Sequence, residues 1–228
     1  MRTAVGLVLG VTLLAAARAA DEAPTPDERK TIDALAKLAR SASVDPGLPP
    51  DARVAVKFDA PTNAQLAALK KYPNVGAVTV LDASRLTEPG YAALRDLPNL
   101  RRLVLNRAAM TEKAAAAVGE LKHLRALALI GSGVTDAELV PLKKLTRLES
   151  LDLSQNPRVT DKGMAAVRAL ERLEFLYLAE TSITDKGLFE LKPLDGLRTL
   201  NVTGTRVTSA GAEKFLDEMP NLRAVRGK

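Results

Sequence analysis

The sequence contains no cysteine, no tryptophan and one histidine, and only 3% of its 228 residues are aromatic. The absence of cysteine excludes disulfide bonds, thiolate zinc sites and a cysteine nucleophile. A single histidine excludes a multi-histidine metal centre, and the sequence has no glycine-rich phosphate-binding motif. We therefore expect no metal and no cofactor. The formal net charge is only +6, and basic residues do not alternate with aromatic ones, so nucleic-acid binding is not expected.

The first nineteen residues have the organisation of a secretory signal peptide. Arg2 supplies the positive start, an apolar stretch spans residues 5–17, and Ala17-Arg18-Ala19 forms a small-residue cleavage site. The apolar stretch is shorter than the roughly 20 residues that cross a bilayer, and no second one follows. We expect residues 1–19 to direct export, with no integral membrane segment in the mature chain. Export without cysteine is typical of a bacterial periplasmic or secreted protein.

From residue 51 onward the chain repeats one pattern every 24 or 25 residues. Each unit begins with apolar residues spaced as L-x-x-L-x-L, which predicts a strand with one buried face. The units begin at Val75, Leu100, Leu124, Leu148, Leu173 and Leu197, with a short unit at Val54 before them and a truncated one at Leu222 after them. Eight units in one register indicate a repeat protein rather than a generic helix or strand.

The second half of each unit contains an apolar residue, a threonine and usually an acid. Threonine is a good N-cap, and an acid in the first turn favours the positive end of the helix dipole. We therefore expect helices to start after Thr87, Thr111, Thr135, Thr160, Thr184 and Thr208. These helices carry apolar pairs three residues apart, from Leu94 and Leu97 to Leu216 and Met219, which should face the strands.

With these motifs, the sequence resembles bacterial leucine-rich-repeat proteins of the ribonuclease-inhibitor-like type, whose units carry Thr-Asp-x-Gly-Leu. It is also similar to the repeats of eukaryotic F-box proteins, although no F-box precedes them. The resemblance covers residues 51–228. It implies an α/β leucine-rich-repeat solenoid with a curved parallel sheet on the concave face and helices on the convex face, a fold that binds proteins.

Two details of the repeats carry further expectations. Glycine recurs three residues after the threonine cap, which predicts a close approach of helix and strand, at Gly90, Gly163, Gly187 and Gly211. Many leucine-rich repeats place asparagine after the strand, but here only Asn156 matches. Hydroxyl groups and the backbone must supply the other turn hydrogen bonds.

Residues 20–50 read as a linker with a capping helix. Thr25 and Glu28 form a capping-box motif with proline at the first helical position, which predicts a helix from Pro26 to about Ala42. A solenoid needs its first apolar layer covered, and the apolar stripe of this helix suits that role.

Candidate chemistry is sparse. His123 precedes Leu124, at a position where other units have ordinary exposed polar residues, so a hydrolase that uses His123 with an Asp or Ser neighbour has little support. Three acids at the repeat period are explained by helix capping, although a weak divalent-cation site along one edge remains open; they are Asp136, Asp161 and Asp185.

Strand residues that alternate with the buried leucines point outward on the concave face. Phe175 and Tyr177 occupy two of these positions in a chain with four phenylalanines and three tyrosines. Aromatic residues and arginines are frequent in binding hot spots. We therefore predict an exported, non-catalytic interaction module that binds an unidentified protein through Arg102, Asp152, Phe175, Tyr177 and Asn201.

Other interpretations stay open at this point. Exposed aromatic residues are common, and the acids and bases on neighbouring strands can simply pair with one another. The protein can also be a structural component of the cell envelope that self-associates or contacts polysaccharide. The sequence does not give the partner or the oligomeric state.

Overall fold

The structure is a computed structural model that describes residues 23–226. The predicted signal peptide, residues 1–19, lies outside the described residues. Within them, nine strands form one sheet in chain order. Strands β2 to β9 are parallel, and β1 pairs antiparallel with β2 at one edge. The strands are β1 (Ser41–Val44), β2 (Val54–Phe58), β3 (Val75–Val80), β4 (Arg102–Leu105), β5 (Ala126–Ala128), β6 (Ser150–Asp152), β7 (Phe175–Tyr177), β8 (Thr199–Asn201) and β9 (Ala224–Arg226).

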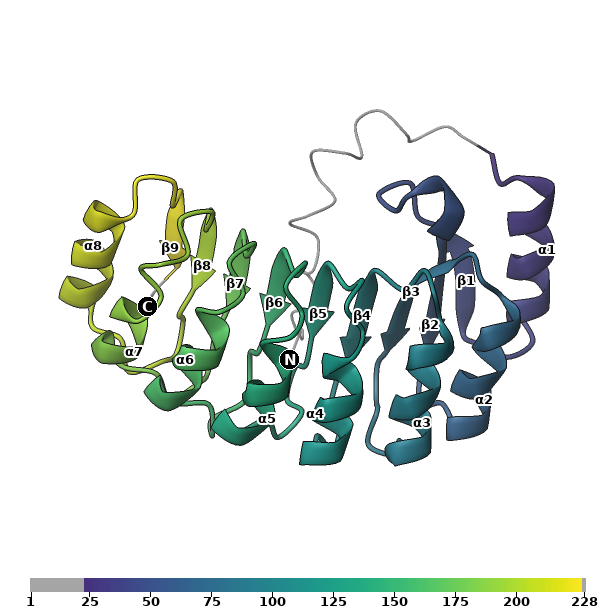
Figure 1. Ribbon diagram of the computed structural model, residues 1–228, viewed down its shortest axis with the longest axis horizontal. Helices are drawn as coiled ribbons and strands as arrows, with labels where there is room; N and C mark the ends of the chain where they lie inside the picture. The colour runs from purple at the N-terminus through teal and green to yellow at the C-terminus, as the bar shows by residue number, and fades with distance from the viewer. Residues whose placement is uncertain (1–22, 227–228) are drawn as a thin grey trace.

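Figure 1 shows the sheet along the inner side of an arch and helices α2 to α8 along the outer side. The helices are short: α1 (Pro26–Leu35), α2 (Asn63–Ala68), α3 (Glu88–Ala93), α4 (Glu112–Gly119), α5 (Asp136–Leu142), α6 (Met164–Val167), α7 (Asp185–Phe189) and α8 (Ser209–Glu218), with 3-10 turns at Pro50–Ala52, Leu69–Lys71, Leu94–Asp96 and Asp161–Gly163. The predicted threonine at each helix start is the N-cap in all six repeats. The solenoid prediction is therefore confirmed.

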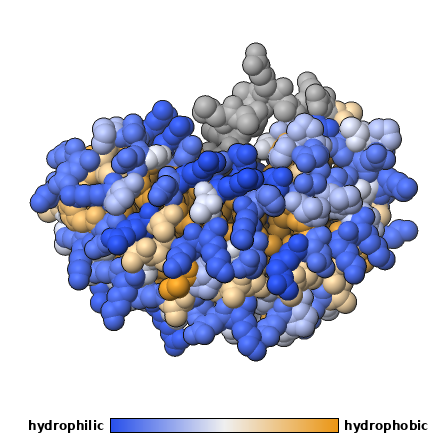
Figure 2. Space-filling view, in the orientation of Figure 1, coloured by the Kyte–Doolittle hydropathy of each residue, from blue (hydrophilic) through white to orange (hydrophobic). Residues whose placement is uncertain are grey.

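One continuous apolar core runs between the sheet and the helices and contains the leucine positions of the strands. Figure 2 shows that hydrophilic residues cover most of the surface in this view, with hydrophobic ones visible in smaller patches between them. The predicted helix pairs are buried in it, including Leu94 and Leu97. The last helix differs from the prediction. Leu216 is 40% exposed, whereas Phe215 is fully buried and packs edge-on against the Phe189 ring. The three-residue spacing was therefore wrong by one position in α8.

The N-terminal helix is shorter than predicted. Helix α1 ends at Leu35, and Ser41–Val44 forms β1 instead of the end of a helix, because this segment pairs with β2. The capping box of Thr25 and Glu28 is present as predicted. Glu28 also binds Arg53 through two hydrogen bonds, Nε to Oε1 at 2.8 Å and Nη2 to Oε2 at 3.0 Å. This buried pair ties α1 to the start of β2, and Leu35 enters the core.

The turns after the strands use the groups that the sequence predicted. Asn156 is fully buried; its Oδ1 accepts hydrogen bonds from the backbone N–H groups of Ser132 and Val134, both at 3.0 Å, and its Nδ2 donates to the carbonyls of Leu129 and Leu153. At the same repeat position in other units, backbone carbonyls accept hydrogen bonds from the side-chain hydroxyl groups of Ser132, Thr181 and Thr205.

Candidate binding face on the sheet

Two rows of side chains cross the sheet on the side opposite the core. They alternate with the core leucines along each strand, and none of them belongs to the core cluster. Strand register places the members of each row side by side. We call Ala77, Arg102, Ala126, Ser150, Phe175 and Thr199 the first row, and Thr79, Val104, Ala128, Asp152, Tyr177 and Asn201 the second row. The predicted site residues all lie in these two rows.

The rows change in character along the solenoid. Strand β5 contributes only Ala126 and Ala128, whereas β7 contributes Phe175 and Tyr177. The second row therefore changes from a small to a large side chain across β6. There, Asp152 lies between Ala128 and Tyr177.

Arg102 makes a contact that the sequence did not reveal. Its Nη1 donates to Asp45 Oδ2 at 2.5 Å, and both side chains are 18% exposed. Asp45 belongs to the segment between β1 and β2, and its Oδ1 also accepts a hydrogen bond from the backbone N–H of Gly47. The charge of Arg102 is therefore already paired within the chain, and its part in partner binding stays a prediction.

Asp152 is 7% exposed. Its Oδ1 accepts a hydrogen bond from the backbone N–H of Ser154 at 2.9 Å. Burial raises the pKa of Asp152, and the hydrogen bonds from Ser154 oppose that rise. Among the residues that the structure describes, Asp152 forms no ion pair. It is a carboxylate held in one orientation by the turn that follows β6.

The aromatic pair is less accessible than predicted. Phe175 and Tyr177 do share one side of the sheet, on either side of the core residue Leu176, but only Phe175 is partly exposed. Tyr177 is 3% exposed, which corrects the expectation that both rings lie open to solvent. The next strand adds Asn201, partly exposed, whose Oδ1 accepts from the backbone N–H of Thr203 at 3.0 Å.

The charges at the strand starts pair across neighbouring strands. Arg125 Nη1 lies 2.7 Å from Glu149 Oε1, and Arg198 Nε lies 3.4 Å from Glu174 Oε2. The interpretation that neighbouring units pair their charges is confirmed at these two places. Arg101 differs, because its Nη1 is buried without a hydrogen-bond partner.

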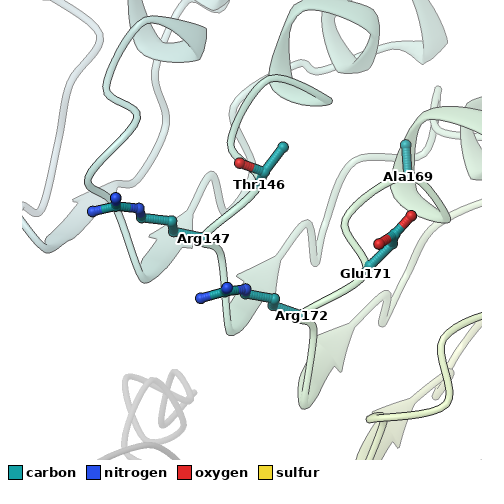
Figure 3. Close-up of a pocket in the computed structure, with 5 residues that line it drawn as sticks. All are labelled: Thr146, Arg147, Ala169, Glu171 and Arg172. Carbon is teal, nitrogen blue, oxygen red and sulfur yellow. The ribbon is translucent and has the colours of Figure 1, made fainter.

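A polar hollow of about 300 Å³ lies outside the binding face, where the chain passes from a helix into the next strand. It is lined by Thr146, Arg147, Ala169, Glu171 and Arg172. Figure 3 shows Arg147 and Arg172 extending in the same direction from consecutive units. His123 occupies the position equivalent to Arg147 in the preceding unit, and its Nδ1 lies 3.3 Å from Arg147 Nη1. A guanidinium cannot orient a catalytic histidine as a carboxylate does, so the hydrolase alternative gains no support from this contact.

The repeated aspartates have a structural role. Each of Asp136, Asp161 and Asp185 accepts two hydrogen bonds from the threonine cap of the next unit. In the described part of the chain, no group of three or more His, Cys, Asp or Glu side chains is arranged to hold a metal ion. The possible cation site along this edge therefore loses its sequence rationale, because the carboxylates bind threonines.

A curved parallel sheet with one strand and one short helix per 24- or 25-residue unit defines the leucine-rich-repeat fold. The family described as Leucine Rich repeat matches residues 144–167 and 197–216. The structure of internalin C2 from Listeria monocytogenes is similar, with a TM-score of 0.54 and 16% identity over 90% of this chain and 94% of that chain. At this identity the similarity is one of fold.

A second Listeria monocytogenes structure, internalin F, gives a TM-score of 0.49 with 16% identity, over 75% of this chain and 54% of that chain. No curated protein sequence matches the chain. In residues 23–226, no helix is long and apolar enough to cross a membrane.

Proposed function

We propose that this protein is an exported bacterial interaction module that binds another protein through the two rows on the concave side of its sheet. The observation that supports this most is the juxtaposition of Asp152 with Tyr177 and Phe175 on neighbouring strands, beside the alanines of β5. Binding hot spots combine aromatic side chains with a few oriented polar groups in a depression. The second row ends in Asn201, whose amide oxygen accepts the backbone N–H of Thr203. No catalytic role is proposed for any residue.

The test compares proteins captured by the mature chain and by a Phe175→Ala/Tyr177→Ala variant. Both are immobilised and exposed to periplasmic and secreted fractions of the source organism. A Val140→Ala variant provides the control, because Val140 is an exposed apolar residue on α5, on the opposite side of the molecule. We expect a protein that the parent and the Val140→Ala variant retain and the double variant loses. Equal retention by all three would show that binding does not use this face.

A second function, self-association in the cell envelope, is favoured by one observation. Leu216 is a large apolar residue, 40% exposed, on the last helix of the described solenoid. Sedimentation at increasing protein concentration tests this function. A mass that rises with concentration in the parent and stays monomeric in a Leu216→Lys variant supports it.

We also propose the finer features that the sequence suggested: ribonuclease-inhibitor-like repeats, export by residues 1–19, and capping of the solenoid by residues 20–50. The Thr-Asp-x-Gly motif supports the repeat type, and the Glu28–Arg53 pair with Leu35 supports the cap. N-terminal sequencing of the exported protein tests the signal peptide, with a start near Ala20 expected and a start at Met1 contradicting cleavage.

A further inference from the structure

We propose that Asp152 receives a cationic side chain, a lysine or an arginine, of the bound protein, with Tyr177 and Phe175 packing beside it. This inference rests on the proposed function, because it names the chemistry that the partner presents to the same face. Five features support it: charge pairing on the face, the turn at Asp152, the neighbouring aromatic rings, the small side chains of β5 and the burial of the carboxylate.

Charge pairing distinguishes Asp152 from the other acids on this side of the sheet. Glu149 is paired with Arg125, and Glu174 is paired with Arg198. Asp152 has no such cation among the described residues, although it is only 7% exposed. Arg101 has an Nη1 without a hydrogen-bond partner, but it lies just before β4, two strands away from β6. It is also three positions before Val104, the residue of β4 that shares a row with Asp152. A cation from outside the chain would supply the missing charge partner.

The turn after β6 does not require this charge. Asn201 stands at the same repeat position in β8, and its Oδ1 accepts the N–H of Thr203 just as Asp152 Oδ1 accepts the N–H of Ser154. An amide therefore performs the local structural role equally well. The negative charge of Asp152 has no structural task in the turn, which leaves it available for a ligand.

The surroundings suit a long cationic side chain better than a small ion. Ala128 lies beside Asp152 on β5, so the stem of a lysine or an arginine would meet an apolar neighbour there. Tyr177 lies on the other side, and an aromatic ring face attracts a guanidinium or an ammonium group. Partial desolvation strengthens an ion pair relative to one in water. Burial already raises the pKa of Asp152, and a bound cation would favour its ionised form.

The first experiment uses a blocked Gly-Arg-Gly tripeptide as the probe and an otherwise identical citrulline peptide, which is neutral and nearly the same shape, as the control. Backbone amide shifts of Ser154 and Tyr177 are followed by NMR during titration of the mature protein. We expect saturable shifts with arginine and about tenfold weaker binding with citrulline, equivalent to about 1.4 kcal/mol. Equal binding of the two peptides, or no shift with arginine at millimolar concentration, would overturn the proposal.

Asp152→Asn removes the charge and keeps the turn. Asp82→Asn is the matched control, because Asp82 Oδ1 also accepts the backbone N–H of the serine two residues later, Ser84, at 3.0 Å, but Asp82 lies outside the two rows. We expect Asp152→Asn to lose the preference for arginine over citrulline and Asp82→Asn to keep it. The capture experiment separates the two proposals. A partner lost with Phe175→Ala/Tyr177→Ala but fully retained by Asp152→Asn would support the face and refute the cation, whereas retention by both variants would refute the face itself.

Discussion

Asp136, the first residue of α5, binds the helix cap of the next unit: its Oδ1 accepts the backbone N–H of Thr160 at 2.8 Å, and its Oδ2 accepts the Thr160 hydroxyl at 2.6 Å. Asp161 binds Thr184 and Asp185 binds Thr208 in the same way, and Asn63 makes the corresponding pair of bonds with Thr87. Since the stability of a solenoid depends on contacts between neighbouring units, these bonds couple one helix start to the next.

We expect Asp161→Ala to lower the free energy of unfolding by about 1–3 kcal/mol, because two hydrogen bonds to a carboxylate are lost and the Thr184 N–H loses its partner. Glu112→Ala is the matched control. Glu112 holds the same repeat position, but the next cap, Thr135, is bound by Glu138 of its own helix. Denaturant unfolding of the three proteins measures the difference. Equal losses in the two variants would show that the bond between units adds nothing.

The repeated glycines belong to the same arrangement, which corrects the prediction of a close helix-to-strand approach. A Cβ at Gly187 would lie 2.2 Å from Asp161 Oδ1, and one at Gly211 would lie 2.3 Å from Asp185 Oδ1. Glycine thus makes room for the carboxylate of the preceding unit. The unit before Ala114 has Glu88 at the position of the Asp or Asn. In agreement with this, Ala114 stands where several other units have glycine.

Gly211→Ala should therefore destabilise the parent by about 1–3 kcal/mol, as overpacking does. In an Asp185→Ala background the sign should reverse, because the three atoms nearest the added Cβ all belong to the Asp185 carboxylate and alanine is the better helix former by about 0.5–1 kcal/mol. A double-mutant cycle of unfolding free energies checks this. Additive effects would mean that the glycine serves another purpose.

How much of this was predictable differs between the repeats and the site. Strands, threonine caps and core leucines follow from local patterns that recur in every unit. The need for glycine at these positions depends on a carboxylate or amide in the preceding unit, so one unit alone does not show it. The sequence does contain a sign of this dependence, because an Asp or Asn precedes each repeated glycine by about one repeat, as Asp161 precedes Gly187. The Arg102–Asp45 contact joins residues 57 positions apart through a segment outside the repeats, so no periodic pattern could reveal it.

Asn156→Ala should be among the most destabilising single substitutions in a turn. It leaves the buried N–H groups of Ser132 and Val134 without a partner, each at a cost of about 1–3 kcal/mol. Thr181→Ala, at the same position in the next unit, removes only the bond from its hydroxyl to the Leu178 carbonyl and is the control. Thermal unfolding should show a clearly larger loss for Asn156→Ala, and comparable losses would contradict the hydrogen-bond account.

The Glu28–Arg53 pair should make stability depend on acid. The hydrogen bond from Arg53 chiefly lowers the pKa of Glu28 from 4.5 to about 2. A carboxyl whose pKa is lowered on folding stabilises the fold above its unfolded value, and this stabilisation is lost as pH falls from 4.5 towards 2. The difference in unfolding free energy between the parent and Glu28→Gln should shrink over that range. Asp27→Asn, which removes an exposed charge from the same turn, is the control, and a pH-independent difference would contradict the assignment.

Arg102 should behave as a structural residue rather than a partner-binding one. Asp45 binds both Arg102 and the Gly47 N–H, so Arg102→Gln should release the segment after β1. Backbone amides of Gly47 and Leu48 should then exchange hydrogen severalfold faster, whereas amides in β7 should not change. Arg125→Gln, which breaks a more exposed pair with Glu149, should leave Gly47 and Leu48 unaffected. If Arg102→Gln instead leaves this hydrogen exchange unchanged but abolishes partner capture, the contact with Asp45 is dispensable and Arg102 takes part in partner binding.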